Sequence, residues 1–452
     1  MKYLYSILIT TFLVAGLSSC EKQLDIQPTQ SIDQDKALLT SKDVEVALVG
    51  AYAELGSVNF YGGRVYLTAD FLANVNAIEW SGTFQGLTQI INKTVPKDNL
   101  FVNNIWTAGY DVINDVNNVL AALDKVEATK KDRFEGEAKF IRGAVYFELV
   151  RLFGKAYNDG DPASNLGVPL VLVPTVAVDG SNLVSRATVN EVYNQAIADL
   201  IEAEAKLPDN NGFFASKSAA AGMLSRIYLQ KGDFANSAQA ADRVITTSGK
   251  TLTPKYIDAF PPQGSTAGSN TTEDVFAIQV TAQSGANGYN EFYSSSDFGG
   301  RGDAAITEDW IQNYEANDER LEIFYESGGS VYNSKSSNQY GNVTIIRIAE
   351  MYLNRAESNL RLFPAAPIGG VTPTQDLNMI RSRVGLPSKV ATLDNVLKER
   401  SLEFAFEGFS LHDAKRTQQN IASIPWNDNK LVFPIPQREI DANPNLIQNP
   451  GY

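Results

Sequence analysis

The stretch 217–248, KSAAAGMLSRIYLQKGDFANSAQAADRVITTS, is the part of the sequence that best predicts the fold class. Its first half carries the small residues Ala219–Gly222, which allow close packing against a neighbouring element. The dipeptide Gly232-Asp233 then marks a turn, and Ala238 and Ala241 line the segment that follows it. We therefore expect two antiparallel helices joined by a tight turn.

This predicted hairpin resembles one tetratricopeptide unit, a helix–turn–helix of about 34 residues. A helix hairpin outside that repeat class is the alternative. Either kind of hairpin leaves an apolar face uncovered, so neighbouring helix pairs must stack on it.

Helical periodicity continues on both sides of the hairpin. The expected helices span 37–54, 104–125, 132–153, 189–206, 307–326, 344–362, 374–384 and 392–408. The region 261–303 is instead rich in Gly, Ser, Asn and Thr, with a strand-like run at 275–281. Residues 431–452 are rich in Pro and Asn, which predicts no helix. The sequence thus indicates a mostly α fold with long irregular loops and little β structure.

The N-terminus predicts a lipid anchor. Residues 1–19 combine the charge of Lys2 with an apolar run too short to span a membrane, which needs about 20 residues. The following Leu17-Ser18-Ser19-Cys20 resembles the bacterial lipobox. We expect cleavage before Cys20, attachment of diacylglycerol and palmitate to this cysteine, and a polar tether over 20–35. An acylated cysteine carrying more than one chain gives stable membrane attachment.

Composition and motifs exclude several functions. The net charge of −14 argues against nucleic acid. One histidine, His412, and one cysteine argue against zinc or copper, and we expect no cofactor. Calcium at Asn158–Asp161 stays open, although this loop lacks the full EF-hand spacing. No nucleophile elbow, phosphate loop, dinucleotide fingerprint or zinc-protease motif occurs, while a carboxylate pair for glycoside hydrolysis stays open.

Four stretches of the sequence resemble the SusD/RagB family of outer-membrane nutrient-binding lipoproteins. They are EAKFIRGAVYFELVRLFG (137–154) with GVPLVL (167–172), RIAEMYLNRAESNLRL (347–362), LNMIRSRVGLP (377–387) with LKERSLEFAFEG (397–408), and LVFPIPQREIDANPNLIQNPGY (431–452). The resemblance covers nearly the whole chain in the right order. The residues of these motifs themselves have the pattern of packed, charge-paired helices, so we assign them to the fold and not to a ligand site.

The resemblance implies a SusD-like fold, with tetratricopeptide-like helix pairs in an N-terminal region (36–260) and a C-terminal SusD/RagB region (261–452). It also implies a binding protein and not an enzyme. Such proteins capture oligosaccharides, or in some cases peptides, on the outer face of the outer membrane and pass them to a SusC-like TonB-dependent transporter. The alternatives left open are peptide capture at an exposed strand edge, glycoside hydrolysis and a non-importing surface scaffold.

A sugar site needs aromatic rings for stacking and polar groups that orient hydroxyls. Two regions, 60–86 and 284–303, offer this mixture and are expected to be ligand-binding loops. The ligand-binding candidates are Arg64, Asn76, Trp80, Tyr289, Tyr293 and, at the start of the helix expected at 307–326, Trp310. For each aromatic candidate the alternative is packing in the core.

Overall fold

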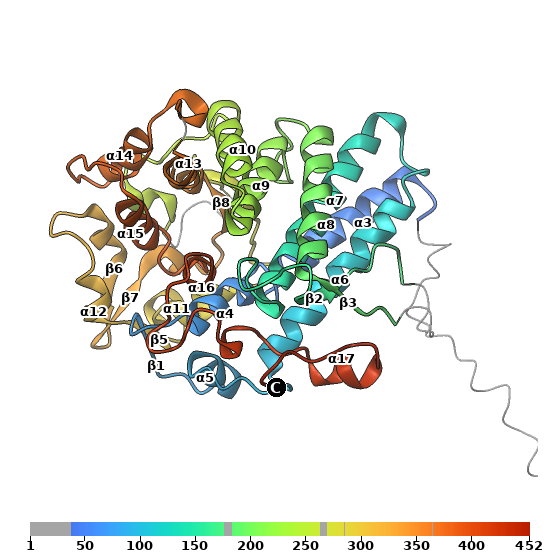
Figure 1. Cartoon of the computed structure of the whole chain (residues 1–452), viewed down its shortest axis with the longest axis horizontal. Coiled ribbons are helices and arrows are strands. Elements are labelled where there is room, and N and C mark those ends of the chain that lie inside the picture. Colours follow the sequence, from blue (N-terminus) through green and yellow to red (C-terminus); the bar gives the residue numbers. More distant parts are fainter. Residues whose placement is uncertain (1–37, 176–182, 263–268, 284, 364) are drawn as a thin grey trace, which may run out of the picture.

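Long helices form the frame of the protein, as Figure 1 shows for the computed structural model. The structure describes residues 38–175, 183–262, 269–283, 285–363 and 365–452, so the predicted signal peptide and tether lie outside the described residues. The longer helices are α3 (Ser41–Leu55), α6 (Leu100–Ala121), α7 (Ala128–Phe153), α8 (Val189–Lys206), α9 (Lys217–Lys231), α10 (Phe234–Thr247), α13 (Ile348–Leu362), α14 (Pro373–Arg383) and α15 (Leu393–Glu403). The prediction of a mostly α fold is confirmed.

Shorter elements fill the rest of the described chain. The short helices are α4 (Arg64–Leu72), α5 (Gln85–Ile91), α11 (Gly288–Tyr293), α12 (Glu308–Ile311), α16 (Ser410–Arg416) and α17 (Gln437–Ala442). The 3-10 turns are η2 (Tyr256–Ala259), η3 (Ser296–Phe298), η4 (Glu319–Ile323), η5 (Ser334–Ser336), η6 (Ile368–Gly370) and η7 (Asn429–Leu431). In the described ranges no helix is long and apolar enough to cross a membrane.

The predicted hairpin is present as α9 and α10. Ser216 caps the start of α9, and Gly232 ends this helix in the left-handed conformation, with φ of 80°, that favours glycine. Asp233 then accepts a hydrogen bond from the backbone N–H of Asn236 and starts α10. The small residues of α9 admit a close neighbour, because a Cβ on Gly222 would lie 2.9 Å from a methyl carbon of Ile346. Local capping and small side chains therefore explain the hairpin.

Neighbouring helices stack on this hairpin in sequence order. α7 packs on α6 and α8, α8 packs on α9, and α10 packs on α13, which in turn contacts α14 and α15. Figure 1 shows this array running from α3, α6, α7 and α8 on one side, through α9 and α10, to α13, α14 and α15 on the other. One main core of buried apolar side chains runs through most of it.

The described strands form three small antiparallel sheets. One sheet has the order β1-β5-β7-β6, from β1 (Ile78–Trp80), β5 (Ala304–Ile306), β7 (Ser330–Asn333) and β6 (Phe324–Ser327). The second pairs β2 (Leu166–Pro169) with β3 (Arg186–Thr188), and the third pairs β4 (Asp274–Ile278) with β8 (Val343–Arg347). Pairing of Ile78 with Ile306 joins the segments that follow α4 and α11.

Three of the predicted element boundaries are wrong. The segment 307–326 holds only α12, η4 and the first part of β6: α12 ends at Ile311, and Asp318 caps η4 by accepting a hydrogen bond from the backbone N–H of Arg320. The segment 344–362 begins as strand β8, which pairs with β4 before α13 starts. Residues 431–452 include α17, because Pro436 stands just before its first turn, where the missing N–H costs nothing.

A buried ionic cluster holds the C-terminal helices to β8. Arg347 donates hydrogen bonds to Glu273, Glu403 and Glu407, and the guanidinium of Arg383 also contacts Glu273 and Glu403. These side chains, apart from Glu407, are almost completely buried. The sequence analysis assigned the charged residues of these motifs to the fold. In the structure they hold the turn after α15 in place, and this turn carries Phe406 and Glu407.

Candidate functional site

The two predicted ligand-binding regions meet in the structure. Phe292, in α11, lies 6.1 Å from the ring of Trp80 and 5.6 Å from that of Phe84, measured between ring centroids. The guanidinium of Arg301 lies 4.8 Å above Phe84, which is 37% exposed. These regions are less irregular than expected, because each contains a short helix, α4 or α11, whose apolar side chains enter the core.

The candidates of the first region lie around this contact. Trp80 is half-buried, packs its ring against Phe71 and donates its indole N–H to Thr88 at 2.8 Å. The guanidinium of Arg64 lies over the ring of Phe101, and burial lowers the pKa of this arginine. Asn76 is exposed and has a left-handed backbone, with φ of 58°. None of these three lines the cavity described below.

The candidates of the second region lie deeper. Tyr293 is almost fully buried and donates its hydroxyl to Asp70 at 3.2 Å, so its side chain is part of the core. Tyr289 stacks on Tyr293 with an interplanar angle of 8° and is 8% exposed. Trp310 is half-buried in a separate groove, where it packs near Phe406 and faces α15 and α16. The six candidates therefore do not share one site.

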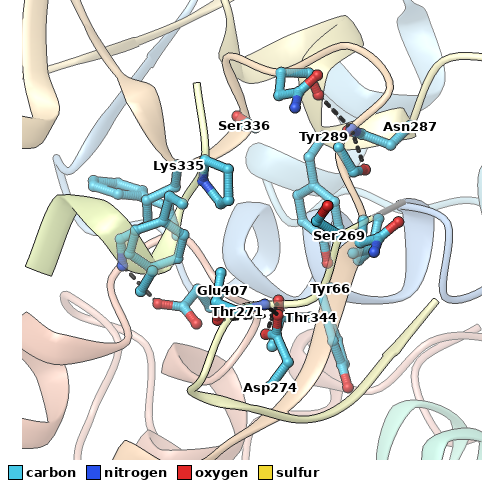
Figure 2. A pocket seen from close by; sticks show the side chains of 18 residues that line it. Tyr66, Ser269, Thr271, Asp274, Asn287, Tyr289, Lys335, Ser336, Thr344 and Glu407 are labelled. Atoms are coloured by element: carbon cyan, nitrogen blue, oxygen red, sulfur yellow. Dashed lines mark hydrogen bonds and ion pairs between the residues drawn. The ribbon is translucent and has the colours of Figure 1, made fainter. Parts of the chain in front are cut away.

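A cavity lined by aromatic rings and polar groups lies beside Tyr289 (Figure 2). About 80 Å³ of it is open to the centre of a water-sized sphere, and its walls are formed by α4, α11, η5, the β4–β8 pair and the turn after α15. Its aromatic lining consists of Tyr66, Phe260, Tyr289 and Phe406. Its polar lining consists of Ser269, Thr271, Asp274, Asn287, Lys335, Ser336, Asn338, Asn342, Thr344 and Glu407. Such a mixture of aromatic rings and polar groups is typical of small-ligand sites.

Local backbone geometry places two of these rings. Phe406 has φ of 63°, a left-handed conformation that non-glycine residues rarely adopt, and it follows directly on α15. Gly408, with φ of 79°, allows the chain to pass the ring of Tyr66, because a Cβ there would lie 2.4 Å from the Cβ of Tyr66. The strained turn at 406–408 therefore brings Phe406 and Glu407 to the cavity.

The polar groups of the cavity differ in whether they already have a hydrogen-bond partner. Asp274 accepts hydrogen bonds from the hydroxyl of Thr344 at 2.7 Å and from the backbone N–H of Thr271 at 2.6 Å, and burial raises its pKa. In contrast, the hydroxyls of Tyr289 and Ser336 are buried and have no hydrogen-bond partner among the described residues. Figure 2 shows Tyr289 and Asn287 on one side of the cavity, and Lys335 and Glu407 on the other.

Most of this cavity was not found by reading the sequence. Tyr289 was a named candidate and Tyr66 lies in the first predicted region, but Phe260, Lys335 and Asn342 carry no recognisable motif. Phe406 lies within a motif that we assigned to the fold.

The structure adds no support for the calcium site that the sequence left open at Asn158–Asp161. The side-chain amide of Asn158 donates to the carbonyl oxygen of Arg416, and Asp161 accepts from the hydroxyl of Ser164. The described residues hold no group of three or more His, Cys, Asp and Glu side chains that could bind a metal ion.

Fold and cavity together define a class: a largely helical protein with a cavity of aromatic and polar lining where its irregular segments meet the helical array. Comparison with known families agrees with this class. A family described as "Starch-binding associating with outer membrane" matches residues 22–229, and the SusD family matches residues 321–431. The chain belongs to the SusD/RagB family, as the sequence motifs indicated.

Individual relatives are similar over different lengths. SusD-like protein P2 of Formosa agariphila is 26% identical over the full length of both chains. The starch-binding protein SusD of Bacteroides thetaiotaomicron is 32% identical over 127 residues, which are 24% of this chain and 21% of that protein. The crystal structure of a SusD superfamily protein from Bacteroides thetaiotaomicron has 26% identity and a TM-score of 0.80, covering 91% of this chain and 100% of the other.

Proposed function

We propose that this protein is a surface lipoprotein that captures oligosaccharides and hands them to a SusC-like TonB-dependent transporter for import. Family membership supports the outer-membrane setting, and the description of the matched family and the name of the relative SusD support a glycan as ligand. The lipid on Cys20, the outward placement and the transporter partner rest on the lipobox and on the family resemblance.

The observation that carries the proposal is the cavity lined by Tyr66, Phe260, Tyr289 and Phe406. Sugar rings present apolar C–H faces and hydroxyl edges, so they fit a site that combines aromatic faces with uncharged polar groups. The buried hydroxyls of Tyr289 and Ser336 have no hydrogen-bond partner among the described residues, so each has the capacity to bond a sugar hydroxyl. We therefore assign glycan binding to this cavity in preference to the surface around Trp80.

The carboxylates of the cavity support binding and not hydrolysis. A glycosidase needs one carboxyl group that can be protonated and a second that stays ionised. Both oxygens of Glu407 are engaged by protein groups, since they accept hydrogen bonds from Lys335 at 2.6 Å and from Arg347 at 2.9 Å. The oxygens of Asp274 are engaged by Thr271 and Thr344.

Phe260→Ala tests the proposal, because Phe260 is half-buried and lines the cavity. Lipid-free mature protein is titrated by calorimetry with maltohexaose, laminarihexaose, cellohexaose, mannohexaose and xylohexaose. We expect at least one of them to bind, and Phe260→Ala to weaken it by about tenfold, as loss of a stacking face costs on the order of 1 kcal/mol.

Phe363→Ala is the matched control, since Phe363 is 89% exposed and does not line the cavity. It should bind like the wild type. Equal binding by both variants would contradict the assignment of the cavity, and absence of binding to every oligosaccharide would contradict the proposed function itself.

A further inference from the structure

Three charged side chains line the cavity within the described part of the chain: Asp274, Lys335 and Glu407. Whether a charged ligand can bind depends on whether any of them is free to pair with it. A charge taken into a buried site without a partner loses its hydration and gains nothing in return. The hydrogen bonds of these three groups therefore decide the charge of the ligand.

Lys335, the cation among them, is fully engaged. An ammonium group has three N–H donors, and those of Lys335 reach the carbonyl oxygens of Glu403 at 3.1 Å and Ala405 at 2.8 Å and the carboxylate of Glu407 at 2.6 Å. The same ammonium lies 4.9 Å from the ring centre of Phe260 and is only 4% exposed. Burial also lowers its pKa. Lys335 therefore offers no free donor to an acidic ligand.

The two carboxylates are engaged as well. Glu407 receives two hydrogen bonds of 2.9 Å from the guanidinium of Arg347, in addition to the one from Lys335. Asp274 receives hydrogen bonds from Thr271 and Thr344 and is 3% exposed. A cationic amino sugar would therefore compete with Arg347 and Lys335 for Glu407, while an acidic sugar would meet two carboxylates and no free cation.

We propose that the cavity selects uncharged saccharide units and excludes uronates and sulfated sugars. This inference rests on the proposed function, since it names the ligand class of the same cavity. The buried lining groups that have no hydrogen-bond partner among the described residues, the hydroxyls of Tyr289 and Ser336, are neutral donors and acceptors. The net charge of −14 adds a long-range repulsion of polyanions.

Matched pairs of oligosaccharides test the inference. Mannohexaose is compared with the hexamer of mannuronic acid, which has the same β-1,4 backbone and a carboxylate at each C6. A glucose hexamer that binds is compared with its C6-oxidised form, and xylohexaose, which has no C6, is compared with xylohexaose that carries a glucuronic acid branch. We expect the acidic member of each pair to bind at least about tenfold more weakly, since it buries an unpaired charge.

An engineered cation supplies the positive control. Ser269 is exposed and lines the cavity, so Ser269→Arg should recover binding of the acidic member in a salt-sensitive way. Ser81→Arg, at an equally exposed serine beside Trp80, should not. Equal or tighter binding of the acidic member by the wild type would overturn the inference and leave the proposed function standing. Absence of binding to neutral and acidic forms alike would overturn both.

Discussion

At the scale of the residue, sequence composition named candidate side chains but could not show which way each of them faces. Trp80 stands among polar neighbours, and ligand binding and core packing both stayed open for its ring. The structure buries part of that ring against Phe71 and Phe292 because β1 pairs with β5, a contact between residues more than 200 positions apart. Phe406 was not among the candidates, because its position at the cavity depends on a left-handed backbone in the turn after α15, which the sequence does not reveal.

Asp70 gives a prediction about pH. It is buried beside the turn that carries Phe406, it accepts hydrogen bonds from Tyr293 and from the N–H of Gly408, and burial raises its pKa to about 7. The unfolded chain has the lower, ordinary pKa, so the folded state holds the extra proton between about pH 4 and about pH 7. The contribution of this group to stability therefore falls as pH rises through that window and stays low above it.

Asp70→Asn should remove this fall, because an amide does not ionise. We expect the variant to exceed the wild type in stability near pH 8 by on the order of a few kcal/mol, and to lose that advantage near pH 5. Urea denaturation at the two pH values measures it. Asp161→Asn is the control with opposite sign, since Ser164 lowers the pKa of this exposed carboxylate. An unchanged difference between wild type and Asp70→Asn at both pH values would contradict the prediction.

At the scale of the element, capping signals and apolar spacing predicted the long helices well. The capping box of Thr188 and Glu191 starts α8 where expected, and Gly232 ends α9. The same reasoning failed at 307–326, where an apolar rhythm resembles a helix but the chain forms α12, η4 and the first part of β6, which pairs with β7. Local patterns therefore sufficed where helices cap themselves, and failed where a strand pairs with another segment of the chain.

The helical array also gives a prediction about buried charge. Arg226, in α9, forms two hydrogen bonds of 2.8 and 2.7 Å with Glu350, in α13, and both side chains are almost completely buried. Arg226→Met leaves Glu350 buried without its main partner, which should lower the free energy of unfolding by about 3–5 kcal/mol. Chemical denaturation followed by circular dichroism measures this loss.

Arg243→Met is the matched control, because Arg243 joins α10 to Glu204 of α8 in an ion pair that is 46% exposed at the arginine. We expect it to cost at most about 1 kcal/mol. The double change Arg226→Met and Glu350→Met should recover part of the loss. Equal losses for the buried and the exposed arginine would show that burial of the pair is not the cause.

At the scale of the whole molecule, the motifs predicted family and architecture, and the cavity required three dimensions. Tyr66, Phe260, Asn342 and Phe406 come from segments far apart in the chain, and no spacing in the sequence joins them. The two predicted loop regions lie side by side in the structure, a contact that composition did not predict. Composition could not show how deeply each aromatic ring is buried, or which partner each charged side chain has.

The proposed anchor makes a prediction about the whole protein in the cell. If Cys20 holds the chain on the outer face of the outer membrane, a protease added to intact cells should remove the mature protein. Cys20→Ser should release it from the membrane fraction, since the lipid chains supply the attachment. Detection by antibody in whole-cell and membrane fractions measures both effects. Full protection of the mature chain in intact cells would contradict exterior placement.

The position of a bound glycan is the most direct test of the account. A crystal structure of the lipid-free mature protein, grown with whichever neutral hexaose binds in solution, locates it. The account predicts density for sugar rings against Phe260 and Tyr289, with a sugar hydroxyl bonded to the hydroxyl of Tyr289. An empty cavity with the glycan lying instead on the surface around Trp80, Phe84 and Arg301 would contradict it.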